Sequence, residues 1–150
     1  MSKPVVYLAG LISTEVPKSL YWRHEVTPRL EICGFEVLSP MRGKNTEGLM
    51  QGGLVDPNLT SKDILLRDFN DVKRADVLLA HLELFGSTRP LLGTIAELAW
   101  AWQLNIPVVG VAHSANQYMR HHPFTREFCS SYHDNVWVAV DFIVNYYGRS

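Results

Sequence analysis

The sequence predicts a doubly wound α/β protein, with a sheet of about five mostly parallel strands and helices on both faces. Short runs rich in β-branched residues alternate with longer segments of helical periodicity, the pattern typical of βαβ units. The strand runs are apolar throughout, as expected of strands buried on both faces of a parallel sheet. With 150 residues, 47% of them hydrophobic, the chain suits a single domain spanning residues 1–150.

The first two predicted strands flank an amphipathic helix. Pro4–Gly10 is a β-rich run closed by glycine, and the end of this strand is expected to face a ligand. Apolar residues at helical spacing predict a helix over Ser19–Cys33, which Gly34 ends, and Phe35–Leu38 forms the second strand. The polar stretch Ser39–Asn58 is longer than an ordinary connection, so we interpret it as a lid.

The next helix and strand precede the central segment of the chain. Thr60 is followed three residues later by Asp63, the spacing of a helix cap, and the helical period continues to Ala75. Asp76–Leu82 then reads as a strand buried on both faces. These features indicate one further βαβ unit with a right-handed crossover.

The central segment joins a loop to a helix that carries a carboxylate. Phe85–Leu92 has the composition of a surface loop, and the stretch Leu92–Trp102 joins this loop to a helix that is predicted to carry Glu97 in its first turn. In open parallel sheets, ligands bind beyond the carboxyl ends of the strands, where such loops meet helices. Glu97 is therefore a candidate catalytic residue. The alternative is a carboxylate that only complements the helix dipole.

The C-terminal third contains one clear strand and one clear helix. Ile106–Ala112 is a β-branched run that predicts another buried strand, and Val138–Tyr147 predicts a final amphipathic helix. Between them, His113–Asp134 is polar and aromatic, and its mixed pattern predicts no single helix.

Composition argues against binding to polymers or membranes. The formal net charge is -1, and no run of Lys or Arg is present, so we expect no nucleic-acid partner and no membrane association. The N-terminus enters a strand within a few residues and no apolar run could span a bilayer, so we expect a cytoplasmic protein. Cys33 and Cys129 have no partner spacing typical of metal sites and are interpreted as simple thiols.

Most catalytic motifs are missing, which leaves carboxylates as the candidate chemical groups. Gly10 is not followed by the other glycines of a dinucleotide fingerprint, and the sequence contains no Walker motif. The histidines lack ligand spacing, and no serine lies in a GxSxG elbow. We therefore expect neither a metal nor an organic cofactor.

Four groups of residues together resemble the nucleoside 2-deoxyribosyltransferase family over nearly the whole chain. They are Tyr7, Arg67–Asp68, Gly93–Glu97 and His133–Asn135. The resemblance implies a flavodoxin-like subunit in which Glu97 attacks the anomeric carbon of a 2'-deoxyribosyl group. It also implies that Tyr7 orients Glu97 and that Asp68 contacts and protonates the leaving base.

The same resemblance implies a site shared between subunits. In the family, an Asp–Asn pair from a neighbouring subunit binds the 5'-hydroxyl and steadies the nucleophile, and Asp134–Asn135 corresponds to it. We therefore expect a homo-oligomer built from dimers. Some family members carry a second base-recognising Asp where this chain has Leu91, so the resemblance implies no preference for purines or pyrimidines.

Four further residues are candidates for substrate binding. Gly10 ends the first strand and Gly93 is the motif glycine, so both are expected to border the substrate. Arg42 and Arg89 lie in loops facing the expected site. Each arginine is either a substrate contact or a solvated loop residue.

The resemblance and the chemistry of carboxylates agree on a reaction. An N-glycosidic bond breaks through an oxocarbenium-like transition state, which a carboxylate stabilises and can trap as a glycosyl ester. We expect transfer of 2-deoxyribose between nucleobases through a glycosyl-Glu97 intermediate, with a deoxyribonucleoside and a free base as substrates. The alternatives are a nucleoside 5'-monophosphate N-glycosidase and a non-catalytic nucleotide-sensing module.

Overall fold

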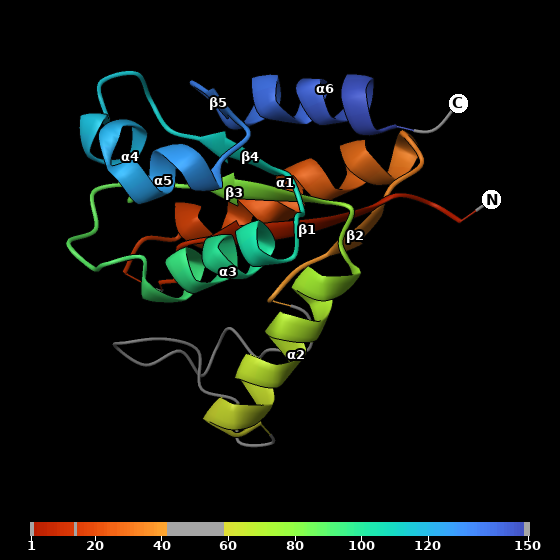
Figure 1. Cartoon of the computed structure of the whole chain (residues 1–150), viewed down its shortest axis with the longest axis horizontal. Coiled ribbons are helices and arrows are strands. Elements are labelled where there is room, and N and C mark those ends of the chain that lie inside the picture. Colours follow the sequence, from red (N-terminus) through yellow and green to blue (C-terminus); the bar gives the residue numbers. More distant parts are fainter. Residues whose placement is uncertain (1, 14, 42–58, 149–150) are drawn as a thin grey trace.

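Five short apolar runs form one parallel sheet in the computed structural model, which describes residues 2–13, 15–41 and 59–148 (Figure 1). The strands are β1 (Val5–Gly10), β2 (Glu36–Leu38), β3 (Val77–His81), β4 (Val108–Val111) and β5 (Ser131–His133). Their order is β2-β1-β3-β4-β5, and every neighbouring pair is parallel. This order is that of the flavodoxin-like doubly wound fold. The predicted fold class is therefore confirmed, with a sheet that is wholly parallel.

Helices cover both faces of this sheet. They are α1 (Lys18–Ile32), α2 (Ser61–Arg74), α3 (Leu92–Gln103), α4 (Gln117–His121), α5 (Pro123–Phe128) and α6 (Val136–Tyr147). Figure 1 shows α1 and α6 together on one face and α3 on the other, with α2 leaning away from the sheet beside α3. The layers bury one apolar cluster on each face of the sheet.

Strand β3 shows why the sheet holds together. Its five residues are all buried, with Leu78 and Ala80 in the cluster under α2 and α3 and Leu79 in the cluster under α1 and α6. Side chains alternate between the two faces of a strand, so an apolar run suits a strand covered on both sides. The central strands are therefore buried on both faces, and loops extend from their carboxyl ends.

Helix α2 begins where its sequence predicts. The Thr60 hydroxyl accepts a hydrogen bond from the Asp63 backbone N–H at 3.1 Å, and the Asp63 carboxylate accepts one from the Thr60 N–H at 3.1 Å. This reciprocal capping box satisfies two backbone donors that a helix start leaves without partners. It fixes the start of the helix that carries Asp68.

Two features of the C-terminal half add detail to the prediction. His113–Asp134, whose mixed pattern predicts no single helix, contains two short helices, α4 and α5, and strand β5. The last helix begins at Val136 instead of Val138, because the Asn135 side chain caps it by accepting from the Val138 N–H at 3.0 Å. Apart from the start of α3, the other predicted boundaries agree within one or two residues.

The predicted lid lies almost entirely outside the described residues. Of the stretch Ser39–Asn58, only residues 39–41 are described, and the candidate Arg42 falls beyond them. The lid and the role of Arg42 therefore stay predictions.

Candidate active site

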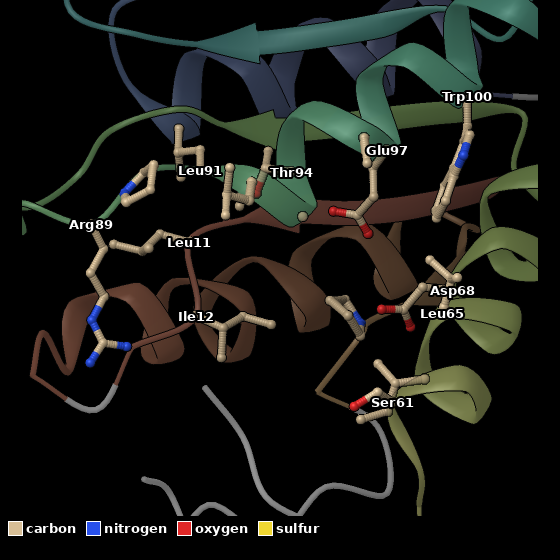
Figure 2. Close-up of a pocket in the computed structure, with 17 residues that line it drawn as sticks. Leu11, Ile12, Ser61, Leu65, Asp68, Arg89, Leu91, Thr94, Glu97 and Trp100 are labelled. Atoms are coloured by element: carbon tan, nitrogen blue, oxygen red, sulfur yellow. The ribbon is translucent and has the colours of Figure 1, made fainter. Parts of the chain in front are cut away.

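A pocket of about 780 Å³ lies at the carboxyl end of the sheet. Its walls come from the loop after β1, from α2, and from the segment that leads into α3 and the first turns of that helix. Figure 2 shows Glu97 entering from α3 and Asp68 from α2, on neighbouring walls. The place agrees with the general position of ligand sites in open parallel sheets.

Glu97 and Tyr7 form a buried hydrogen-bonded pair at this pocket. The Tyr7 hydroxyl donates to Glu97 Oε2, and the two residues are 90 positions apart in the sequence. Tyr7 is fully buried and Glu97 is 7% exposed. Burial raises the pKa of Tyr7 far above its usual range, and the charges of Glu97 and Asp68 raise it further. Tyr7 therefore stays a neutral donor at any ordinary pH and holds the Glu97 carboxylate in one orientation.

The position of Glu97 within α3 differs from the prediction. The helix begins at Leu92, so Glu97 lies in the second turn, and the first turn contains no acidic residue. Glu97 shares the buried face of the helix with Thr94, Leu98 and Ala101. A carboxylate that only complements a helix dipole lies in the first turn and in solvent. The burial and position of Glu97 exclude that explanation.

Asp68 supplies a second carboxylate to the same pocket. Its side chain is largely buried, and Oδ1 lies 3.6 Å from Nη2 of Arg67. The Arg67 guanidinium also donates a hydrogen bond to the Pro40 carbonyl at 2.8 Å. This bond connects α2 to the chain just after β2. The pocket is therefore lined by two carboxyl groups, one of which accepts a hydrogen bond from a buried phenol, and these groups suit nucleophilic and acid–base chemistry.

Three of the predicted substrate-binding residues line the pocket. Gly10, Gly93 and Arg89 all border it. A Cβ on Gly10 would lie 2.9 Å from the His81 carbonyl oxygen, so glycine permits the close approach of the ends of β1 and β3. Arg89 lies at the opposite end of the pocket from Asp68 (Figure 2), and its Nη2 is 3.3 Å from Glu15 Oε1.

Asp134 and Asn135 do not line the pocket within the described part of this chain. They follow β5, which is two strands away from β3 at the edge of the sheet. Asp134 pairs with Arg120 at 2.8 Å, and Asn135 caps α6. Their predicted contribution to a neighbouring subunit's site stays a prediction.

Several pocket-lining residues were not predicted from the sequence, among them Trp100 and Leu65. Trp100, three residues after Glu97, lines the pocket on the side of Asp68, and Leu65 of α2 lies near it (Figure 2). Helical spacing is the signal that identifies Trp100, because residues i and i+3 share a face. Trp100 packs edge-on against Phe69, with ring centroids 5.2 Å apart. These side chains give this end of the pocket an apolar wall suited to a flat ring.

The described residues contain no group of three His, Cys, Asp or Glu side chains arranged to hold a metal ion. Among the same residues, no helix has the length and apolar character needed to cross a membrane.

His81, at the end of β3, predicts a dependence of stability on pH. It lies between the rings of Trp22 and Phe85, with centroid distances of 5.1 and 4.7 Å. Burial lowers the pKa of His81 to about 4, from 6.5, and the Arg23 charge contributes to the lowering. Between pH 6.5 and pH 4, the unfolded chain therefore binds a proton at this histidine, whereas the folded chain does not. Neutral His81 costs the folded state no stability above pH 6.5. The folded state loses stability relative to the unfolded state as the pH falls from 6.5 towards 4.

Between pH 7 and pH 4 this group is expected to lower the free energy of unfolding by about 3 kcal/mol. Denaturant unfolding at several pH values would measure it, and His81→Gln should remove this part of the dependence. The exposed His113→Gln is the matched control. Equal pH slopes for wild type and His81→Gln would contradict the assignment.

Comparisons with known proteins agree with this fold. The sequence profile of the family described as nucleoside 2-deoxyribosyltransferase matches residues 6–144. The structure is similar to a 2-deoxyribosyltransferase from Bacillus psychrosaccharolyticus, with 19% identity, a TM-score of 0.66, and coverage of 95% of this chain and 91% of that one. The comparison with curated proteins gave no significant match.

Two further solved structures share the fold. A Leishmania mexicana 2-deoxyribosyltransferase is 15% identical, with a TM-score of 0.67 and coverage of 95% of this chain and 98% of that one. A CMP N-glycosidase from Clostridium botulinum is 14% identical, with a TM-score of 0.60 and the same two coverages, 95% and 98%. At these identities the likeness concerns the fold.

Proposed function

Because the chain belongs to the nucleoside 2-deoxyribosyltransferase family, we propose that it transfers 2-deoxyribose between nucleobases through a covalent glycosyl-Glu97 intermediate. The observation that carries the proposal is the buried hydrogen bond from Tyr7 to Glu97, beside a pocket that Asp68 also lines. A buried carboxylate held in one orientation is the arrangement that nucleophilic attack requires.

In the first step, a Glu97 oxygen forms a bond to C1' of the nucleoside as the C1'–N bond breaks. The electron pair of that bond leaves with the base, and the Asp68 carboxyl supplies a proton to the base. The Glu97 carboxylate stabilises the positive charge that develops on the sugar ring. The hydrogen bond from Tyr7 fixes the Glu97 rotamer and stabilises the negative charge of its carboxylate.

In the second step, the nitrogen of an incoming base attacks C1' and Glu97 departs as a carboxylate. The base loses a proton to Asp68, which restores the starting state. Because acid and base roles alternate on one residue, the same pocket serves both directions of exchange. Water competes with the base for the intermediate, so exclusion of water decides between transfer and hydrolysis.

The pocket also supports a placement of the substrate. Trp100 and Leu65 form an apolar wall beside Asp68, where the base is proposed to lie. Gly10 and Gly93 also border the pocket, where small residues leave room for the sugar. Arg89 borders the end away from Asp68 (Figure 2) and is proposed to contact the substrate there.

An exchange assay tests the proposal directly. The protein is incubated with deoxyinosine and free adenine, and deoxyadenosine is measured by chromatography. A second arm uses deoxycytidine 5'-monophosphate and cytidine 5'-monophosphate with no acceptor base. Deoxyadenosine formation supports transfer, whereas base release from the monophosphates alone indicates an N-glycosidase. No reaction in either arm, over a panel of nucleosides, contradicts an enzymatic role.

The proposal includes a homo-oligomer, built from dimers, in which Asp134 and Asn135 complete the site of a neighbouring subunit. Both residues lie outside the pocket of their own chain. We expect Glu97→Ala and Asn135→Ser, each inactive alone, to recover activity when the two chains are co-expressed. A mixed dimer holds one site with both substitutions and one site with neither.

The serine at position 135 is chosen because Asn135 also caps α6. Serine caps helices about as well as asparagine but is shorter, so the fold is kept while the reach is lost. Exchange rates of purified mixed oligomers are compared with those of each variant alone. Mixed oligomers without recovered activity, or a fully active Asn135→Ser, would remove the shared-site proposal.

A further inference from the structure

The Asp134 side chain is held in one place although it lies at the surface. It is 61% exposed, in the short segment between β5 and α6, and its Oδ1 accepts a hydrogen bond from Arg120 Nη2 at 2.8 Å. Ion pairs at the surface add little to stability, because two mobile side chains must be held in one geometry. The contact therefore does more to orient Asp134 than to stabilise the fold.

Arg120, on α4, is itself fixed by contacts with the body of the protein. Its Nε and Nη2 donate to the Ala112 carbonyl, just after β4, at 2.9 and 2.6 Å. Its guanidinium carbon lies 5.4 Å from the centre of the Tyr132 ring. The Tyr132 hydroxyl in turn donates to one carbonyl of α4 and one of α5. Arg120 therefore links the end of β4 to the Asp134 carboxylate.

Two polar groups beside this link are left to meet a ligand. Arg120 bonds to Oδ1 of Asp134, and within the described residues Asp134 Oδ2 accepts no hydrogen bond. Asn135 Oδ1 accepts from the Val138 N–H in the cap of α6, which leaves the Asn135 Nδ2 group as a donor. A hydroxyl group both donates and accepts. Asp134 and Asn135 therefore offer the acceptor and the donor that one hydroxyl group needs.

We infer that Arg120 is a positioning residue that orients Asp134 towards a sugar hydroxyl of the nucleoside bound by a neighbouring subunit. The inference rests on the proposed function, in which Asp134 and Asn135 complete that subunit's site. Arg120 does not line the described pocket of its own chain, so it acts through Asp134. The planar guanidinium suits this role, because it bonds two acceptors in a fixed geometry.

The first experiment removes the hydroxyl groups of the substrate one at a time. Exchange with hypoxanthine is measured for 2'-deoxyadenosine, 2',5'-dideoxyadenosine and 2',3'-dideoxyadenosine, with wild type and Arg120→Gln. For 2'-deoxyadenosine we expect kcat/KM of the variant to fall about tenfold, because a hydrogen bond to a charged group is weakened. With one of the two analogues the fall should shrink to about twofold or less, since the hydroxyl that Asp134 contacts is missing.

Arg126→Gln is the matched control for this series. Arg126 lies on α5 and forms an exposed ion pair with Glu127 at 3.6 Å, so its variant should keep the wild-type rate with all three nucleosides. The same loss in Arg120→Gln with all three nucleosides would show that Arg120 only supports the fold. An unchanged rate with 2'-deoxyadenosine would also overturn the inference.

A double variant tests whether Arg120 acts through Asp134. If it does, Arg120→Gln combined with Asp134→Asn should lose no more rate than Asp134→Asn alone, because the arginine then has no carboxylate to orient. Losses that multiply in the double variant would mean that Arg120 affects the rate by another route.

Mixed oligomers show which subunit's site Arg120 serves. Arg120→Gln is co-expressed with Glu97→Ala, and the exchange rate is expressed per intact Glu97. In a mixed dimer, the subunit that keeps Glu97 receives Asp134 from the chain that keeps Arg120. The rate per intact Glu97 should therefore return to the wild-type value. A rate that stays at the level of Arg120→Gln alone would place the effect within one subunit and overturn the inference.

A binding measurement separates this inference from the proposed function. Calorimetry compares the three nucleosides with Glu97→Gln, which prevents turnover, and with Glu97→Gln carrying Arg120→Gln in addition. We expect about tenfold weaker binding of 2'-deoxyadenosine in the second protein and nearly equal binding of one analogue. That pattern in a protein whose wild type exchanges no bases would sink the proposed function and leave the inference standing. Identical affinities in an active enzyme would do the reverse.

Near-UV circular dichroism selects the variants that keep the native packing. If Arg120→Gln does not fold, Arg120→Lys replaces it, because lysine keeps the charge but lacks the planar fork that bonds Ala112 and Asp134 together. A loss that disappears with one analogue supports the inference, and an equal effect on all three nucleosides overturns it.

Discussion

Replacing Glu97 with glutamine is expected to lower the exchange rate by at least roughly 1,000-fold, because no carboxylate then remains to attack C1'. Glutamine has the same shape and can still accept the hydrogen bond from Tyr7. The free energy of unfolding should therefore change by no more than about 1 kcal/mol. A large loss of rate without a loss of stability is the signature of a residue that acts in the transition state.

The measurement combines steady-state exchange with trapping of the intermediate. A 2-fluoro-2-deoxynucleoside slows breakdown of the glycosyl ester, so mass spectrometry should find the added sugar on the peptide that contains Glu97. Glu127→Gln, an exposed carboxylate of α5, is the matched control and should keep the wild-type rate. A retained rate above about a tenth of wild type, or a label on another residue, would assign the nucleophile elsewhere.

The central part of the fold is predictable because local and long-range preferences agree there. The runs that form β1 and β3 are apolar on both sides of the strand, and both strands are buried on both faces. Thr60 and Asp63 mark the start of α2 by a local capping box. Features of this kind depend on a few neighbouring residues, so the sequence alone reveals them.

The segment His113–Asp134 is not predictable in this way. Helices α4 and α5 have five and six residues, and β5 has three. Helices this short are not stable in isolation and depend on contacts with the rest of the protein. The Tyr132 hydroxyl, for example, donates to the Met119 and Thr125 carbonyls and thereby ties β5 to both helices. Such contacts join residues whose spacing carries no periodic signal.

The candidate site is predictable only in part, for a related reason. The family resemblance identifies Tyr7, Asp68 and Glu97, but the hydrogen bond between Tyr7 and Glu97 depends on the packing of β1 against α3. The helix start at Leu92 was not predicted well, because its cap position holds Leu91, which makes no side-chain cap bond. The burial of Arg23 follows from the path of the loop after β1, which no local pattern of the sequence encodes.

Replacing Asp68 with asparagine is expected to slow transfer from poor leaving bases by about 100-fold to 1,000-fold. A purine base departs as an anion unless it is protonated, and asparagine cannot supply that proton. An electron-poor leaving group departs without help, so a 4-nitrophenyl 2-deoxyriboside should lose less than about tenfold. The size of the defect should therefore rise as the leaving group becomes more basic.

The measurement is a plot of log kcat/KM against the basicity of the leaving group, for wild type and Asp68→Asn. Asp71→Asn is the matched control, because Asp71 is one turn further along α2 and does not line the pocket in the described structure. The control should follow the wild-type slope, whereas Asp68→Asn should give a steeper one. Parallel lines for wild type and Asp68→Asn would mean that Asp68 donates no proton in the transition state. Its ion pair with Arg67 would then explain the defect as a loss of α2 packing, and the proton must come from another group.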